Sequence, residues 1–277
     1  MTSSVTFTIM ISLILATTGC QTDKTSRTDT FTPDTDTNLS VAAAFLDGGQ
    51  PQKAMFELRG ILEKEPKNSK ALTLMGLAQL ALKNPKKAVE HLEKAWTLEA
   101  KSEHALNLSS AYLENNQLDS AQKIIKKGLN LKEKPPYRHK ERFYHNLGLV
   151  AERKRRLDLA QKSYEEALVE NPTFYLSRAR LAQIYESKKM TKAAQEHWEM
   201  ARAACPSCFE ATSHLSQIYK GKGDIKTALG LVRDYRKIEG LTTHEMKSAA
   251  ELELSLNAEF KRSAMSRIDT PKQESER

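Results

Sequence analysis

The feature that most constrains the fold of this 277-residue chain is a small residue that recurs at a nearly constant interval. Its spacings along the chain are 34, 33, 39, 34 and 34 residues. The recurring residues are Ala54, Ala88, Ala121, Ala160, Ala194 and Ala228. A bulky residue follows each of them four positions later, and a second small residue precedes each by twelve. A repeat of this length indicates stacked copies of one small structural unit.

The repeated unit resembles the tetratricopeptide repeat, in which two antiparallel helices are joined by a short turn. Small residues are needed where two helices cross closely, and bulky residues fill the gap to the next unit. The clearest copy spans residues 141–174, with Gly148, Ala160, Tyr164 and Pro172 in register. The low content of glycine, proline and aromatic residues also favours helices over a sheet. We therefore expect an all-α solenoid of about six repeats.

The boundaries of the expected units follow from this register. Repeats one to three are expected over residues 39–135 and repeats four to six over 141–242. A link at 136–140 follows from Pro135 and Pro136, since two prolines cannot continue a helix, and the stack is expected to break or bend there. Thr242 and Glu245 predict a capping box at the start of a final capping helix over 243–260. A disordered tail is expected over 261–277.

The N-terminal segment reads as a targeting signal. The apolar run from Val5 to Ala16 is too short to span a bilayer, and the sequence from Leu15 to Cys20 resembles a bacterial lipobox. That resemblance implies a signal peptide over 1–19 and a diacylated Cys20, with 20–38 as a polar, flexible tether. An ordinary secretory signal with an incidental cysteine is the alternative.

The first helix of each repeat is expected to line a concave groove. In the first three units its inward positions are mostly apolar, whereas in the last three they are mostly polar, with Glu152, Gln183 and Glu186 among them. The apolar positions are Leu39, Ala43, Leu46, Leu77, Leu80, Leu106 and Leu113. An exposed apolar stripe marks a binding site for a protein segment, unless the N-terminal helices, or the tether folding back, cover it.

Catalytic chemistry has little support in this sequence. Cys205 and Cys208 form a Cys-x-x-Cys pair, which we interpret as a structural disulfide or two free thiols between repeats five and six. A thiol oxidoreductase built on the same pair is the weaker alternative. Histidines are scattered, and no nucleophile or phosphate-loop motif occurs. We expect no catalytic residues, no metal and no cofactor, and hence no enzyme.

Positive charge is concentrated between Lys123 and Arg156, where twelve lysines and arginines face only three acids, Glu133, Glu141 and Glu152. These residues alone carry a net charge of +9, and the formal net charge of the whole chain is +8. The remainder of the chain is therefore close to neutral. This run is either a solvated outer face or a contact for anionic headgroups, cell-wall polymer or an acidic partner. Nucleic acid is not an expected partner of an exported lipoprotein.

A lipobox, a polar tether and six repeats with an insertion before the fourth unit together resemble the pilotin lipoproteins of type IV pili (the PilF, PilW and Tgl group). The resemblance is closest from Phe143 to Pro172. It implies a lipid-anchored protein on the periplasmic face of the outer membrane that helps a secretin ring to localise and assemble, with the secretin subunit as partner. A scaffold lipoprotein that recruits cell-wall enzymes is the alternative.

Overall fold

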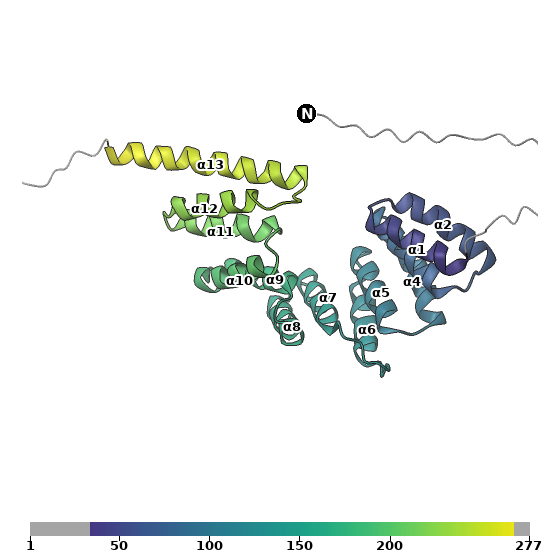
Figure 1. Ribbon diagram of the computed structural model, residues 1–277. Helices are drawn as coiled ribbons and strands as arrows, with labels where there is room; N and C mark the ends of the chain where they lie inside the picture. The colour runs from purple at the N-terminus through teal and green to yellow at the C-terminus, as the bar shows by residue number, and fades with distance from the viewer. Residues whose placement is uncertain (1–33, 269–277) are drawn as a thin grey trace, which may run out of the picture. The chain divides into compact units, whose positions relative to one another are not determined.

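The computed structural model describes residues 34–268, which form thirteen α-helices and no strand (Figure 1). The first six helices are α1 (Thr35–Asp47), α2 (Pro51–Lys64), α3 (Ser69–Ala81), α4 (Pro85–Leu98), α5 (Ser102–Glu114) and α6 (Leu118–Leu129). The next six are α7 (Lys140–Arg153), α8 (Leu157–Glu170), α9 (Tyr175–Ser187), α10 (Thr191–Ala204), α11 (Phe209–Gly221) and α12 (Ile225–Arg236). The last is α13 (Thr243–Ile268). The predicted all-α repeat fold is confirmed.

Consecutive helices pack as pairs, α1 with α2 through α11 with α12, and each pair packs on the next (Figure 1). The recurring alanines lie at the centre of these contacts: all six, from Ala54 to Ala228, are fully buried. The bulky residues four positions later, including Leu58, Tyr164 and Trp198, are also fully buried. The repeat period is therefore a packing period, as the sequence predicted.

Two glycines show how closely the paired helices approach. A Cβ added to Gly76 would lie 2.5 Å from the Leu92 side chain, and one added to Gly148 would overlap the Tyr164 ring. Both lie at the second recurring position, twelve residues before the recurring alanine, and so they mark the crossing of the two helices within one repeat. The absence of a side chain at these positions lets the large residue of the partner helix fit.

The turn within each repeat contains one residue with a left-handed backbone. These residues have φ between 57° and 80° and are Gly49, Lys83, Asn116, Arg155, Lys189 and Gly223. They follow the same register as the alanines. Four of the six are not glycine, although a side chain in this conformation costs about 1 kcal/mol. The sequence does not indicate this feature, because only two of the six turns carry the glycine that usually signals it.

The stack does not break at the insertion, although a break is one of the two outcomes expected there. Residues 130–139 form a loop outside the helices, while α5 packs directly on α7. Phe143 on α7 is fully buried in a core that includes residues of α4, α5 and α6. It fits because Gly128 has no side chain: a Cβ there would lie 2.6 Å from the Phe143 ring. The two prolines interrupt the helix, but the extra residues loop out and leave the helix stacking continuous.

The C-terminal helix is longer than predicted. Thr242 and Glu245 form the expected capping box, with the Thr242 backbone N–H donating to the Glu245 carboxylate at 2.8 Å and the Glu245 N–H donating to Thr242 Oγ1 at 3.2 Å. The helix continues past residue 260 to Ile268, so the first part of the expected disordered tail is helical. Ala249 and Leu256 are buried against the last repeat.

None of the helices between residues 34 and 268 combines the length and apolar character needed to cross a bilayer. The expected signal peptide, Cys20 and most of the expected tether lie outside the described residues.

Candidate protein-binding groove

The seven apolar residues predicted to line the groove do not form an open stripe. Leu39, Leu106 and Leu113 are only 6%, 5% and 3% exposed and belong to the hydrophobic core. Leu46 and Leu80 are half-buried and pack against the same core clusters. Ala43 and Leu77 are half-buried as well, and with Leu39 they line an open groove. The prediction of a continuous exposed stripe is therefore wrong.

The C-terminal end of the expected stripe is covered by α7, the first helix of the fourth repeat. Asn146 Nδ2 donates to Ser109 Oγ at 2.8 Å, and the Arg153 guanidinium donates to the Leu113 carbonyl oxygen. These contacts bring α7 onto α5 next to Leu106 and Leu113. This end of the groove is therefore covered by a helix of the fourth repeat, not by the N-terminal helices that the alternative named.

A groove remains across the first helices of repeats one to three. It has a volume of about 560 Å³ and combines an apolar floor with a charged rim. The residues that line it are Asp36, Leu39, Ser40, Ala43 from α1, Lys70, Thr73, Leu74, Leu77 from α3, and Glu99, Lys101, Glu103, His104 from the start of α5 and the turn before it. We call this set the α1–α3–α5 groove.

The charges at the rim are largely paired with one another. Lys70 Nζ lies 3.7 Å from the Asp36 carboxylate, and Lys101 Nζ lies 2.5 Å from that of Glu99. Hydrogen bonds from Lys101 and Ser69 hold the pKa of Glu99 below its usual value. His104 Nδ1 contacts the Glu99 carbonyl oxygen at 2.6 Å. The rim therefore carries both positive and negative groups, most of which already contact one another. The apolar floor is the part of the groove that is left for a partner to cover.

The corresponding face of repeats four to six has a different character. Its polar side chains link one repeat to the next: Glu152 lies 3.9 Å from Arg180, and Gln183 donates to Glu210 at 2.7 Å. Farther along, Glu186 contacts His214 Nδ1 at 3.1 Å. Since these groups already satisfy one another, a partner would have to break existing contacts to bind here. The α1–α3–α5 groove, by contrast, has an apolar floor that a partner can cover without breaking such contacts.

The Glu186 contact belongs to a small aromatic cluster that sequence reasoning did not find. Trp198 Nε1 donates to the Glu186 carboxylate at 2.9 Å, and the Trp198 ring stacks on His214 at a centroid distance of 4.3 Å. Trp198 is fully buried. Because the three residues come from three helices and share no short motif, only the structure brings them together.

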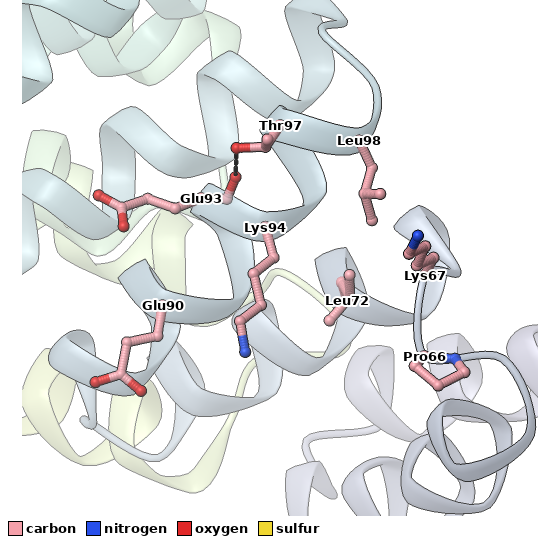
Figure 2. A pocket seen from close by; sticks show the side chains of 8 residues that line it. All are labelled: Pro66, Lys67, Leu72, Glu90, Glu93, Lys94, Thr97 and Leu98. Atoms are coloured by element: carbon pink, nitrogen blue, oxygen red, sulfur yellow. Dashed lines mark hydrogen bonds between the residues drawn. The ribbon is translucent and has the colours of Figure 1, made fainter.

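A second hollow lies on the outer side, between α4 and the turn before α3 (Figure 2). Leu72 and Leu98 provide its apolar part, while Glu90 and Glu93 point away from them (Figure 2). Leu72 is only 4% exposed, and Thr97 Oγ1 donates to the Glu93 backbone carbonyl at 2.8 Å. Leu98 is 44% exposed, so this hollow also presents apolar surface. Most of its lining residues come from α4 and the turn before α3, however, and not from the first helices of successive repeats that form the α1–α3–α5 groove.

Cys205 and Cys208 form a disulfide in the turn between α10 and α11. The Tyr235 hydroxyl, from α12, donates to the Ser207 carbonyl within this turn at 2.9 Å. Tyr235 is 1% exposed. The disulfide thus closes a turn that is anchored to the core of the sixth repeat. Within residues 34–268, no three side chains of His, Cys, Asp or Glu lie close enough together to hold a metal ion.

Comparison with known proteins identifies the repeats. Residues 79–140 and 141–174 each match a family model described as tetratricopeptide repeat. The fold is a tetratricopeptide-repeat solenoid. The second match coincides with the unit that the sequence showed most clearly. Tetratricopeptide repeats are protein-interaction modules, so a groove lined by the first helices of successive repeats is a reasonable binding surface.

Several solved structures superpose over most of the chain. Pseudomonas aeruginosa PilF is 18% identical, with a TM-score of 0.61 over 78% of this chain and 96% of PilF. PilW, described as a widely conserved type IV pilus biogenesis factor, is 16% identical, with a TM-score of 0.62 over 78% of this chain and 97% of PilW.

The Cut9–Hcn1 structure from the APC/C has a similar TM-score of 0.61 at 15% identity, but the match covers 42% of that chain. At these identities the similarity concerns the fold. No curated protein sequence matches the chain significantly.

Proposed function

We propose that this protein is a pilotin: a lipid-anchored protein that binds the secretin subunit of a type IV pilus and assists its localisation and assembly. The observation that carries the proposal is the α1–α3–α5 groove, with Ala43 and Leu77 half-buried above Leu39. In this proposal the groove binds the secretin subunit, and the lipid anchor holds the protein at the membrane.

The chemistry of the groove fits an apolar protein segment. Burying apolar surface of a partner on Leu74, Leu77 and Ala43 would stabilise a complex by roughly 25 cal/mol per Å² removed from water. The rim charges, Lys70 with Asp36 and Lys101 with Glu99, would orient that segment without requiring a net charge. An amphipathic helix laid along the groove is the simplest occupant.

The type of complex is suggested by PilF and PilW. Both superpose over nearly their whole length and over 78% of this chain, which supports a similar repeat architecture. PilW is described as a type IV pilus biogenesis factor. The sequence ending at Cys20, which resembles a lipobox, separately supports the lipid anchor in this proposal.

The proposal includes an outer-membrane, periplasm-facing location and action by binding alone. Acyl chains on Cys20 would hold the protein at the membrane, since each buried methylene contributes about 0.8 kcal/mol. No catalytic residue or cofactor is part of the proposed mechanism.

The test is made in cells that lack the gene. Membranes are fractionated, and the heat-resistant secretin multimer and surface pili are measured after complementation with wild type or with Cys20→Ala. The proposal predicts lost or mislocalised multimers that wild type restores and Cys20→Ala does not. Normal multimers and pili in the deletion strain would overturn it and would favour a scaffold for cell-wall enzymes.

A further inference from the structure

The basic run found in the sequence becomes a continuous cationic surface in the structure. Lys123, Lys126 and Lys127 lie on one face of α6, since residues three and four apart share a helix face. Lys132, Lys134 and Arg138 follow in the loop 130–139, and all six are exposed. Lys140 and Arg142, at the start of α7, are exposed as well. We call these eight residues the cationic surface.

The acids of the same run are withdrawn from this surface. The Glu133 carboxylate accepts a hydrogen bond from the backbone N–H of Ser102 at 2.5 Å, at the start of α5. Glu141 is 4% exposed, with its carboxylate 3.2 Å from His139 Nδ1. Glu152 is half-buried and faces Arg180 on the groove side. None of the three acids therefore neutralises the cationic surface.

The loop 130–139, which carries three of these eight charges, is held in place. Tyr137 packs edge-on against the buried ring of Phe143 at a centroid distance of 5.8 Å. Together with Glu133 it fixes the loop to α5 and α7 through its inward side chains. Lys132, Lys134 and Arg138 alternate with these anchors and remain in solvent.

The charges of the cationic surface are not used within the fold. Other cations between Lys123 and Arg156 do form ion pairs: Lys154 Nζ lies 2.6 Å from the Asp119 carboxylate, and the Arg153 guanidinium lies 3.5 Å from that of Glu114. Among residues 34–268, by contrast, no member of the cationic surface forms an ion pair. Two further acids lie near the cationic surface without forming an ion pair with it. Glu103 lies on α5 near Tyr137 of the loop, and Glu93 on α4 lines the same hollow as Lys123 and Lys127, where it accepts a hydrogen bond from the Tyr112 hydroxyl at 2.5 Å.

The composition of the surface indicates the kind of partner. Six of its eight members are lysines, which act as flexible point charges, whereas recognition of a single phosphate favours the planar fork of arginine. Lys123 and Lys127 also border a hollow lined by Trp96 and Tyr112, and such amphipathic rings favour the boundary between membrane and water. A broad, lysine-rich, unpaired surface suits an array of headgroups better than one bound ion.

We propose that the cationic surface docks on a membrane that contains anionic phospholipid. This inference uses the proposed lipid anchor only to keep the protein near a membrane; the cationic surface would then orient the solenoid on it. It does not depend on a secretin partner.

The experiment measures binding of the full-length chain to vesicles of phosphatidylglycerol mixed with phosphatidylethanolamine, and to neutral phosphatidylcholine vesicles. Using the full chain in every arm makes any contribution of the apolar N-terminus the same throughout. The test variant is Lys126→Glu/Lys127→Glu. The matched control is Lys192→Glu/Lys226→Glu, which makes the same charge change at exposed positions on α10 and α12.

We expect binding to anionic vesicles that is about tenfold or more tighter than to neutral ones and that weakens with added salt. The test variant should lose about tenfold or more of that preference, while the control should retain it. Equal binding to both kinds of vesicle would overturn the inference, as would an equal loss in the control. A preference for soluble polyglutamate or RNA over anionic vesicles would also overturn it and assign the surface to a different polyanion.

Discussion

Gly148 lies where α7 crosses α8, and the Tyr164 ring occupies the space that a side chain would need. Gly148→Ala should therefore destabilise the protein by about 1–3 kcal/mol through overpacking, even though alanine is the better helix former. Gly60 on α2 provides the control, because nothing lies within 4 Å of a Cβ added there. Gly60→Ala should stabilise by roughly 0.5–1 kcal/mol. Urea unfolding of both variants measures the difference, and equal shifts would contradict the packing argument.

His145 predicts a pH dependence of stability. Burial, reinforced by the neighbouring Arg180, lowers the pKa of His145 to about 4 in the folded state, whereas an unfolded histidine titrates near 6.5. Between these values the unfolded state binds the proton and the folded state does not. Stability is therefore full above about pH 6.5 and falls as the pH is lowered toward 4. Burial also lowers the pKa of His91 and of His197, which act in the same direction.

The size of this effect can be isolated with His145→Gln, which removes the titrating group. Between pH 7 and pH 4.5, wild type should lose about 2 kcal/mol more unfolding free energy than the variant. Only the difference in slope matters, because the substitution also disturbs the contact between His145 Nδ1 and Ser177 Oγ at 3.1 Å. Parallel pH profiles would show that His145 does not carry the dependence.

Residue patterns predicted the core of this protein well and its groove less well. Ala54, Tyr164 and Trp198 are buried as their register required. Leu113 has the same register as Leu46 and Leu80, which are half-buried, but Leu113 itself is only 3% exposed. It is covered by α7, from which the Arg153 guanidinium donates to the Leu113 carbonyl oxygen, and no spacing rule shows that contact. The burial of Glu141 could not be foreseen either, because it depends on how the insertion folds back onto α5 and α7.

At the scale of the elements, the insertion and the last helix account for the differences from expectation. Prolines at 135 and 136 correctly indicated a helix interruption, but interruption of one helix does not require a break in the stack. Stacking continues because Phe143 fills the space left by Gly128. The final helix continues to Ile268 because residues 261–268 contain no glycine or proline that would stop it.

The turn between α10 and α11 allows a test of the thiol oxidoreductase alternative. If the Cys205–Cys208 disulfide only closes this turn, the double variant Cys205→Ser/Cys208→Ser should remain folded and lose about 2 kcal/mol or less of unfolding free energy. It should also complement a deletion strain as well as wild type. A folded variant that fails to complement would instead favour a redox role.

At the scale of the whole molecule, the two surfaces with unused binding capacity have different chemistry. The α1–α3–α5 groove has an apolar floor and a balanced rim, and the cationic surface on α6, α7 and their loop is strongly positive. The first suits a protein segment, and the second suits a membrane. One protein could therefore hold a partner while lying on a membrane.

The most direct test of the central claim is the affinity of the purified secretin subunit for Leu77→Glu compared with Val169→Glu. Leu77 lines the groove, whereas Val169 on α8 is 76% exposed and serves as a matched apolar-to-acid control. Leu106 is unsuitable, since a glutamate there would bury a charge in the core.

The account predicts that both variants melt close to wild type. Leu77→Glu should lose at least about tenfold in affinity, which corresponds to about 1.4 kcal/mol, while Val169→Glu should bind normally. Wild-type affinity in a folded Leu77→Glu variant would contradict the assignment of the α1–α3–α5 groove as the binding site.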